Sequence, residues 1–598
     1  MKTYSQIQEI LNADQALIGG LPKLRLVVLR NITLEPIEPY LRYFAYLAGL
    51  NAEVHFGNYD NVYLEAVEEN SSPLASQADA VLIFTKLETL SWGLAKGYNQ
   101  FDIAQIQKEK QRLAQYIHDV LSGIRAKTHA MILWHGFEMP VYPSLGIYDS
   151  QSAFGQTAVI HDLNQILKDS LAQHSNAYFV DVNVSLIRLG MARYYDPRYW
   201  YLAHSPYTRE ALAEIAAEDF KYIRALKGKN KKCLVLDCDN VLWGGVVGED
   251  GLAGIKLGKT YPGSIYYEFQ QTILNLYHRG IILALCSKNN PADVWDVFQK
   301  HPDMALREEH IAAAQINWQD KATNLRQIAA DLNIGLDSIV FADDSEFEIN
   351  LIRHELPEVT ALHLPVERAL FSSDELISPG WFDTLTITSE DKFRGQAYKA
   401  EASRKQMLSN ATDLDSYYRS LELVAEIRLG DAFTIPRIAQ LTQKTNQFNL
   451  TTKRYSEAEI QAFVESDDND VLCLKLGDRF GDLGIVGACI VQYEDGKALI
   501  DTFLFSCRAL GRKAEEVLLN TCLSLAKMRG CSTAIGFYYP TKKNAQVEGF
   551  YPSQGFAGLE DLESEGKSYQ YNLNHYQRQN PEFYRDIRFD GFPSTERI

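Results

Sequence analysis

Two aspartates, Asp237 and Asp239, follow directly on the apolar run 233–236 in the segment KKCLVLDCDNVLWGG. Side chains two positions apart on a strand project to the same side. If the strand geometry continues, both carboxylates point into one crevice at the carboxyl end of a buried strand, where open α/β sheets usually bind ligands. Two carboxylates this close repel each other unless a cation or a shared proton lies between them. The pair therefore predicts a Mg²⁺ ion and a phosphorylated substrate.

Further polar groups follow at suitable places along the chain. Ser287 comes directly after an apolar run in IILALCSKNN, where its hydroxyl can donate to a phosphoryl oxygen. Lys321 begins a helical segment, where its ammonium can neutralise phosphoryl charge. Asp343 and Asp344 end the apolar run in SIVFADDSEFE and offer oxygen ligands to a hard cation. Each group alone is a weak signal, and the order of the groups along the chain carries the prediction.

This order resembles the haloacid dehalogenase (HAD) superfamily of phosphotransferases over about residues 230–365. The resemblance implies that Asp237 is the nucleophile and forms an aspartyl-phosphate. It implies that Asp239 is the general acid for the leaving group and then the base for water. Ser287 and Lys321 would hold the transferring phosphoryl group. The implied Mg²⁺ site is formed by carboxylates from Asp237, Asp239, Asp343 and Asp344.

Short apolar runs alternate with helix-like segments in the first two thirds of the chain, which predicts parallel α/β sheets. The expected strands cover 24–33, 78–87, 130–137, 177–183, 233–237, 281–286 and 339–342, and the expected helices include 264–279, 291–300 and 321–333. We expect a multidomain α/β protein with an SGNH- or flavodoxin-like unit (1–228), a Rossmann-like HAD unit (229–380), a helical connector (381–420) and a GNAT-like α+β unit with a polar tail (421–598).

Composition narrows the class of protein. A chain of 598 residues is too long for one hydrophobic core. The net charge of −18 argues against nucleic-acid binding, which needs a basic surface. We see no apolar run of membrane-spanning length and no signal peptide at the start, so a cytoplasmic protein without a membrane partner is expected. The eight cysteines form no CxxC pair, which favours reduced thiols over zinc.

The segment DTFLFSCRALGRKAEEVLLNT resembles the cofactor-binding strand, loop and helix of GNAT-type acyltransferases. There, backbone N–H groups at a helix N-terminus receive a pyrophosphate. Arg508 and Gly511 match the family pattern, whereas Lys513 replaces its last small residue. That departure leaves room for the phosphopantetheine arm of a carrier protein. The residues expected to bind the pantetheine or the carrier are Arg508, Gly511, Arg512 and Lys513.

Together with IAQLTQKTNQFNLTTKRY (438–455), the two segments resemble FkbH-like proteins of HAD subfamily IIIC. That resemblance implies a glyceryl transferase/phosphatase that takes 1,3-bisphosphoglycerate, removes a phosphate and loads glyceryl as a thioester on an acyl carrier protein for polyketide or tetronate synthesis. A thiolate readily attacks an acyl phosphate, so a cysteine-bound intermediate is expected. Cys507 and Cys286 lie next to the two expected sites, and Cys507 is favoured.

The first unit resembles the SGNH-type domain found in front of some such proteins. VVLRNITLEP stands where the hydrolases carry Gly-Asp-Ser, and Asp196 and His204 resemble their terminal block at a longer spacing. Without the serine nucleophile, we expect docking or substrate shaping rather than esterase activity. Two rival functions stay open: a plain phosphatase acting on a sugar or polysaccharide precursor, and a non-catalytic assembly subunit. The sequence leaves the cognate carrier, the pathway and the oligomeric state open.

Overall fold

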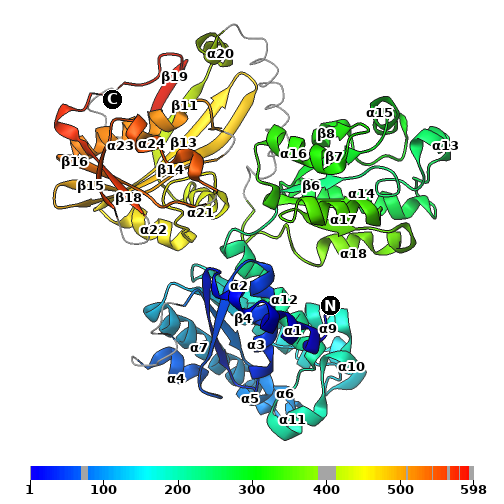
Figure 1. Cartoon of the computed structure of the whole chain (residues 1–598). Coiled ribbons are helices and arrows are strands. Elements are labelled where there is room, and N and C mark those ends of the chain that lie inside the picture. Colours follow the sequence, from blue (N-terminus) through cyan, green and yellow to red (C-terminus); the bar gives the residue numbers. More distant parts are fainter. Residues whose placement is uncertain are drawn as a thin grey trace. The chain divides into compact units, whose positions relative to one another are not determined.

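The computed structural model describes residues 2–68, 74, 78–387, 413–506, 509–541, 543–561, 566–577 and 579–590. The chain folds into two compact units, Met1–Arg224 and Ala225–Ile598 (Figure 1). The two units contain three β-sheets, and each sheet is accompanied by helices. The expected multidomain α/β class is therefore confirmed. Within the described part of the chain, no helix has the length and apolar character needed to cross a membrane.

The first unit is built on a parallel sheet in the order β2-β1-β3-β4-β5. Its strands are β1 (Lys23–Arg30), β2 (Asn51–Phe56), β3 (Ala80–Phe84), β4 (Met131–His135) and β5 (Ala177–Val180). The longer helices are α1 (Tyr4–Ala13), α3 (Glu38–Leu47), α7 (Ile103–Lys127), α8 (Gln156–Ala172), α9 (Val182–Leu189), α11 (Pro197–Ala203) and α12 (Arg209–Leu226). The chain runs from β1 to β2 on one side and then to β3 on the other, so the strand order reverses at β1/β3, the place where such sheets bind ligands.

The second sheet is also parallel, in the order β10-β9-β6-β7-β8. Its strands are β6 (Cys233–Leu236), β7 (Ile282–Ser287), β8 (Ile311–Ile316), β9 (Ile339–Asp343) and β10 (Thr360–His363). Its helices are α13 (Val247–Gly254), α14 (Gly263–His278), α15 (Pro291–Lys300), α16 (Lys321–Leu332), α17 (Glu346–Glu355) and α18 (Ser372–Ile377).

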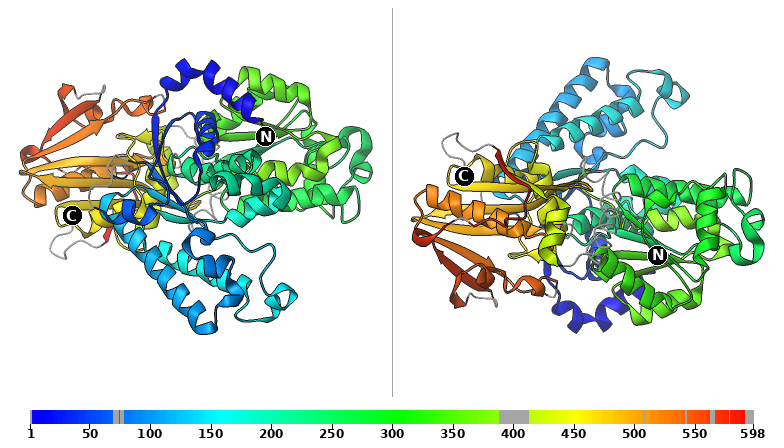
Figure 2. Two further views of the ribbon diagram at one scale, coloured as in Figure 1. Left: turned by 90° about the horizontal axis from the view of Figure 1, so that it is seen from below. Right: turned by 90° about the horizontal axis from the view of Figure 1, so that it is seen from above.

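Successive residues of β6 pack into two different cores, as a strand buried on both faces requires. Leu234 and Leu236 join the core formed with α14 and α15. Cys233 and Val235 join the core formed with α16 and α17. Figures 1 and 2 show the two helical layers on opposite faces of this sheet. This double burial explains why β6 reads as a continuous apolar run.

The third sheet is mixed and runs in the order β17-β18-β16-β15-β14-β13-β11-β19, with β12 pairing with β15 off this path. Its strands are β11 (Val424–Leu429), β12 (Phe448–Asn449), β13 (Asn469–Asp478), β14 (Gly481–Glu494), β15 (Lys497–Phe505), β16 (Thr533–Tyr538), β17 (Ala557–Asp561), β18 (Lys567–Asn572) and β19 (Asp586–Asp590). The helices are α20 (Leu414–Leu421), α21 (Ile435–Lys444), α22 (Glu457–Glu465), α23 (Ala514–Met528) and α24 (Phe550–Ser553).

Several elements differ from the sequence-based expectation. The short strands β2, β8 and β10 were not predicted, and each of them joins a sheet beside a more apolar strand. The polar tail contains β19, which pairs in parallel with β11 and packs Ile587 and Phe589 against the core of the third sheet. Much of the expected helical connector, 388–412, lies outside the described residues.

Candidate active site

The second sheet brings polar residues from three neighbouring strand ends to one edge. Asp237 follows β6, Ser287 ends β7 and Asp343 ends β9. The Asp237 backbone N–H donates to the carbonyl of Ala342 at 3.0 Å, which ties the start of the loop after β6 to β9. Strands β6 and β9 flank the position where the strand order reverses. The site therefore lies where the topology of an open α/β sheet leaves a crevice.

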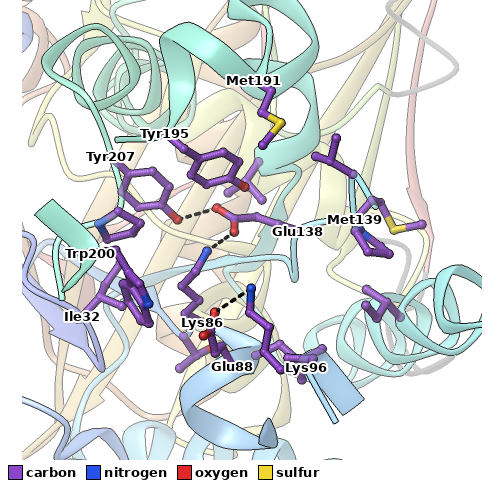
Figure 3. A pocket seen from close by; sticks show the side chains of 18 of the residues that line it. Ile32, Lys86, Glu88, Lys96, Glu138, Met139, Met191, Tyr195, Trp200 and Tyr207 are labelled. Carbon is purple, nitrogen blue, oxygen red and sulfur yellow. Dashed lines mark hydrogen bonds and ion pairs between the residues drawn. The ribbon is translucent and has the colours of Figure 1, made fainter. Parts of the chain in front are cut away.

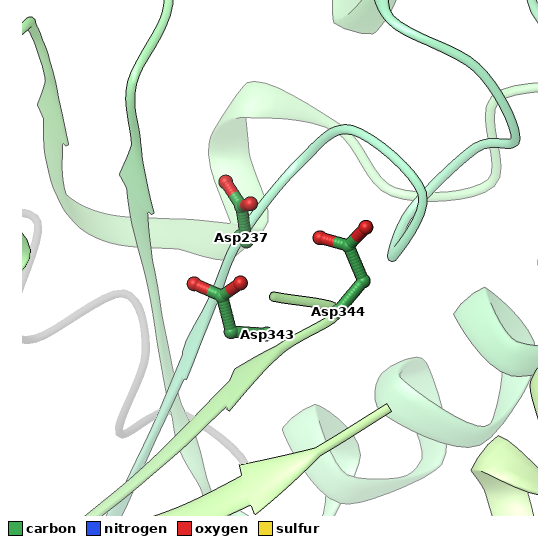
Figure 4. Close-up of side chains that lie close together, drawn as sticks. All are labelled: Asp237, Asp343 and Asp344. Atoms are coloured by element: carbon green, nitrogen blue, oxygen red, sulfur yellow. The ribbon is translucent and has the colours of Figure 1, made fainter. Parts of the chain in front are cut away.

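Three carboxylates converge at this edge (Figure 4). One oxygen each from Asp237, Asp343 and Asp344 lies within 4.8 Å of the others. Asp343 is fully buried, and the Oδ1 atom of Asp237 is buried without a hydrogen-bond donor among the described residues. A buried carboxylate oxygen without a donor is costly unless a cation meets it. Carboxylate oxygens are the ligands that Mg²⁺ prefers, so the arrangement fits a hard divalent cation.

Lys321, the first residue of α16, bridges two of these carboxylates. Its Nζ atom lies 2.9 Å from Oδ2 of Asp237 and 2.6 Å from Oδ2 of Asp343. Burial opposes the charge on Lys321, but the two carboxylates outweigh burial and raise its pKa. The cluster thus holds three carboxylates against one ammonium, which leaves room for a further positive charge.

The acidic groups of the cluster affect each other's protonation. Burial, and then the negative charge of Asp237, raise the pKa of Asp343 to about 6, although Lys321 acts in the opposite direction. Burial and the charge of Asp237 also raise the pKa of Asp344. These directions are those expected of like charges held together in a site of low solvent access.

Asp239 does not join the group of converging carboxylates, contrary to its expected part in the metal site. Its Oδ1 accepts from Trp243 Nε1 at 2.8 Å and from the Val247 backbone N–H at 3.0 Å, and its Oδ2 accepts from Asn289 Nδ2 at 2.7 Å. The strand ends at Leu236, so strand alternation does not extend to the second aspartate. These three donors occupy both oxygens of the carboxylate and fix its orientation.

Two asparagines near the site hold the acidic side chains, and neither was assigned a role from the sequence. Asn289, in LCSKNN, donates to Asp239 and, at 3.5 Å, to the hydroxyl of the buried Ser287. Asn240 donates to Oδ2 of Asp344 at 3.1 Å and accepts from the Gly245 N–H. Asn240 has a φ of 59°, a conformation that asparagine tolerates better than most residues, so its place after the DxD pair was the available signal.

The structure treats the residues that we expect to bind the pantetheine arm or to carry the intermediate in the third region differently from one another. Cys507 and Arg508 lie outside the described residues. Gly511 and Lys513 have φ of 75° and 54°, and Lys513 directly precedes α23. Arg512 is only 3% exposed, so it is not the surface contact for a carrier protein that we expected; its backbone carbonyl accepts from Tyr584 Oη.

Cys286, the less favoured thiol, is fully buried inside β7. Burial raises the pKa of this thiol, so the thiolate needed for attack on an acyl phosphate is scarce. The packing of the sheet, which the apolar sequence around Cys286 predicts, removes it from contact with a substrate.

The segment 448–450 lies beside β15 at the place where β16 no longer pairs with that strand. Strands β15 and β16 pair only as far as Ile500 and Gly536. Beyond that point β12 pairs with Leu504 and Phe505 of β15. Leu450 links the two strands, because its N–H donates to the carbonyl of Phe503 in β15 and its carbonyl accepts from the N–H of Tyr539 just after β16. Residues Phe448–Leu450 thus form a bridge between β15 and the end of β16. An extended ligand with amide groups, such as a pantetheine arm, would need free backbone N–H and C=O groups beside β15 as hydrogen-bond partners. In this conformation those groups are already paired within the chain.

In the first unit, Asp196 and His204 have local structural contacts. Asp196 accepts from the Arg198 N–H at the start of α11 and pairs with the guanidinium of the same residue at 2.7 Å. The His204 ring packs against Trp200 with centroids 5.0 Å apart. Neither contact assembles an acid–histidine pair of the kind that serves a hydrolase.

The chain is similar to a solved structure, the N-terminal part of protein BF1531 from Bacteroides fragilis, which contains a phosphatase domain and is complexed with Mg. The identity is 27% and the TM-score 0.58, and the match covers 64% of this chain and 99% of that one. The match is longer than the segment 229–380 that carries the carboxylate cluster.

Weaker matches involve acetyltransferases. The ribosomal-protein-S18-alanine N-acetyltransferase of Escherichia coli is 13% identical, covering 26% of this chain and 99% of that chain, at a TM-score of 0.21. The GNAT domain of PAT from S. lividans is 14% identical, covering 24% and 89%, at a TM-score of 0.21. At these scores the GNAT resemblance of the third region stays a prediction. No protein-family model and no curated protein matches the chain.

Proposed function

We propose that this protein is a Mg²⁺-dependent phosphatase or phosphotransferase that works through an aspartyl-phosphate on Asp237. The observation that carries the proposal is the convergence of Asp237, Asp343 and Asp344 within 4.8 Å beside the ammonium of Lys321. The similarity at 27% identity to a structure that contains a phosphatase domain and Mg supports it.

In this mechanism an oxygen of Asp237 forms the bond to phosphorus while the bond from phosphorus to the leaving oxygen breaks. Asp239, oriented by Trp243 and Asn289, gives a proton to the leaving oxygen and later takes one from the water that hydrolyses the aspartyl-phosphate. Lys321 offsets negative charge next to the nucleophile. Bound by Asp237, Asp343 and Asp344, Mg²⁺ would reduce the repulsion between the carboxylates and an anionic substrate.

The first experiment measures phosphate release from acetyl phosphate and p-nitrophenyl phosphate, with Mg²⁺ or with EDTA. We expect release that needs Mg²⁺ and that Asp237→Asn abolishes. The matched control is Asp296→Asn, because Asp296 lies on α15 in an exposed ion pair with Lys300. Release that persists in Asp237→Asn, or that the control loses equally, contradicts the proposal. Absence of release from the unaltered protein favours a non-catalytic assembly subunit.

The finer proposal is that the protein is cytoplasmic and loads glyceryl from 1,3-bisphosphoglycerate onto the phosphopantetheine thiol of an acyl carrier protein. It rests on the resemblance to FkbH-like proteins and on two steps. A thiolate attacks the carbonyl of the acyl phosphate and expels that phosphate, which leaves a 3-phosphoglyceryl thioester. The phosphoryl group at C3 is then transferred to Asp237 and released by water, which leaves the glyceryl thioester. Cys507 is the thiol favoured for a covalent intermediate. Incubation with 1,3-bisphosphoglycerate and a holo carrier, followed by intact-protein mass spectrometry, should show a glyceryl adduct on the carrier.

The rival function is a plain phosphatase acting on a sugar or polysaccharide precursor. The bridge formed by Phe448–Leu450 beside β15 and the burial of Arg512 favour it, because they leave an extended pantetheine arm fewer partners. Phosphate release from sugar phosphates without any adduct on the carrier would select this function. A carrier adduct that Cys507→Ser abolishes while phosphate release persists would select glyceryl transfer.

A further inference from the structure

The first unit contains a cavity of about 660 Å³ that the proposed chemistry does not use. Its walls include Ile32 after β1, Lys86 after β3 and Glu138 after β4. These are the carboxyl ends of strands on either side of the β1/β3 reversal, where open α/β sheets bind ligands. Its size is within the range of about 300–1,000 Å³ typical of small-molecule sites.

An ion pair with little solvent exposure lies at one wall of this cavity (Figure 3). The Lys86 ammonium donates to Glu138, with only 15% and 12% of the two side chains exposed. Tyr207 Oη also donates to Glu138, at 2.7 Å. Burial opposes ionisation of Glu138, but Lys86 together with hydrogen bonds from Tyr207 and Tyr195 outweighs burial, and the pKa of Glu138 is lowered. The wall therefore presents a fixed donor beside a fixed acceptor.

Aromatic rings surround this pair. The Lys86 ammonium lies 5.1 Å from the ring centroid of Tyr195, 5.9 Å from that of Tyr207 and 6.0 Å from that of Trp200. Trp92, which also lines the cavity, is 56% exposed. Exposed aromatic faces at the mouth of a pocket mark a binding site more often than a folding requirement.

The charges in the wall are balanced. Lys86 pairs with Glu138, and Lys96 pairs with Glu88 at 3.6 Å. Asp196, also in the wall, pairs with Arg198. Neither an anion nor a cation would meet an excess of the opposite charge here. A lysine offers three N–H donors, and Glu138 is the one acceptor that Lys86 Nζ meets among the described residues, so donors remain for a ligand.

We propose that this cavity binds the ring of a neutral carbohydrate. Hydroxyl groups both donate and accept, which matches ammonium and carboxylate groups held side by side. The C–H faces of a sugar ring pack on flat aromatic side chains such as Trp200 and Trp92, which lose little conformational freedom on binding. The proposal is independent of the phosphatase assignment.

The test uses the full-length protein and saturation-transfer NMR with glucose, galactose and N-acetylglucosamine, and with choline and gluconate as charged comparators. We expect transfer to at least one neutral sugar and none to the comparators. Trp200→Ala and Trp92→Ala should each weaken sugar binding by about tenfold. Trp92 is exposed, so its variant keeps the test valid if Trp200→Ala fails to fold.

The matched control is Tyr59→Ala, because Tyr59 is 48% exposed in the same unit and does not line the cavity. Sugar binding should be unchanged in this variant. Absence of transfer to every neutral sugar overturns the proposal, and so does preferential binding of choline or gluconate. Sugar binding that survives both tryptophan substitutions overturns it as well.

Discussion

The two parallel sheets of this chain place polar groups in the same way and use them differently. In each sheet these groups lie at the carboxyl ends of strands beside the reversal of strand order: Lys86 after β3 in the first sheet, and Asp237 and Asp343 at β6 and β9 in the second. Each site contains a lysine with little solvent exposure. Lys321 lies between two carboxylates with a third nearby, whereas Lys86 has one carboxylate and a ring of aromatic side chains.

The difference teaches that topology decides where a ligand binds and that the balance of charge decides which ligand it is. The cluster of the second sheet carries excess negative charge and a buried carboxylate oxygen without a donor, which calls for a cation. The cavity of the first sheet is neutral and lined by aromatic rings.

The largest difference in phosphate release is expected between variants of the two lysines. Lys321→Met should lower Mg²⁺-dependent phosphate release by about a hundredfold or more, because the nucleophile loses the charge that offsets an anionic substrate. Lys86→Met should leave phosphate release unchanged, although it leaves Glu138 without its cation. Steady-state kinetics of both variants measure this difference, and equal losses would contradict separate roles for the two sites.

A smaller effect concerns metal removal. Mg²⁺ at a hundred times its dissociation constant should stabilise the second unit by about 2.7 kcal/mol over the protein in EDTA. Asp344→Asn should reduce that gain, because it removes one of the three converging carboxylates. Urea unfolding with and without Mg²⁺ measures the gain. Glu88→Gln, in the wall of the first-unit cavity, is the control that should keep it.

Glu515, on α23, is a half-buried carboxylate that belongs to neither site, and burial raises its pKa to about 7, although Lys513 and Arg512 act in the opposite direction. The unfolded chain loses this proton near the ordinary value of 4.5, whereas the folded protein keeps it until about pH 7. The contribution of Glu515 to stability therefore falls as the pH rises from about 4.5 to 7, by on the order of 2 kcal/mol.

Glu515→Gln should flatten this part of the pH profile of the free energy of unfolding. Denaturant unfolding at several pH values measures it, with the neighbouring Glu516→Gln as the control. A profile that keeps its slope in Glu515→Gln would show that another group carries the pH dependence.

The smallest effect is expected at the hydrogen bond that orients the second aspartate. Asn289→Ala removes the donor to Oδ2 of Asp239 and should lower kcat by about tenfold with little change in KM. Asn290→Ala is the matched control, because Asn290 donates to Asp293 instead. A change in KM alone would place Asn289 in substrate binding rather than in orientation of the carboxylate.

Much of the framework could be predicted from the sequence. The helix expected at 291–300 has those bounds as α15, and the apolar runs before Asp237 and Asp343 are neighbouring strands. Apolar runs indicate such strands because a strand buried on both faces needs apolar residues along its whole length. The position of Asp239 could not be predicted, because it depends on where β6 ends and on the donors that later segments of the chain supply.

The sequence by itself determined which residues can do chemistry at the second sheet, since their types and their places after apolar strands are local properties of the chain. Only the tertiary structure decided that Lys321 lies between Asp237 and Asp343, that Arg512 is buried, and that a lysine, a glutamate and three aromatic residues enclose one cavity in the first unit. Such groups are far apart in the chain, and their partners are chosen by strand order and packing.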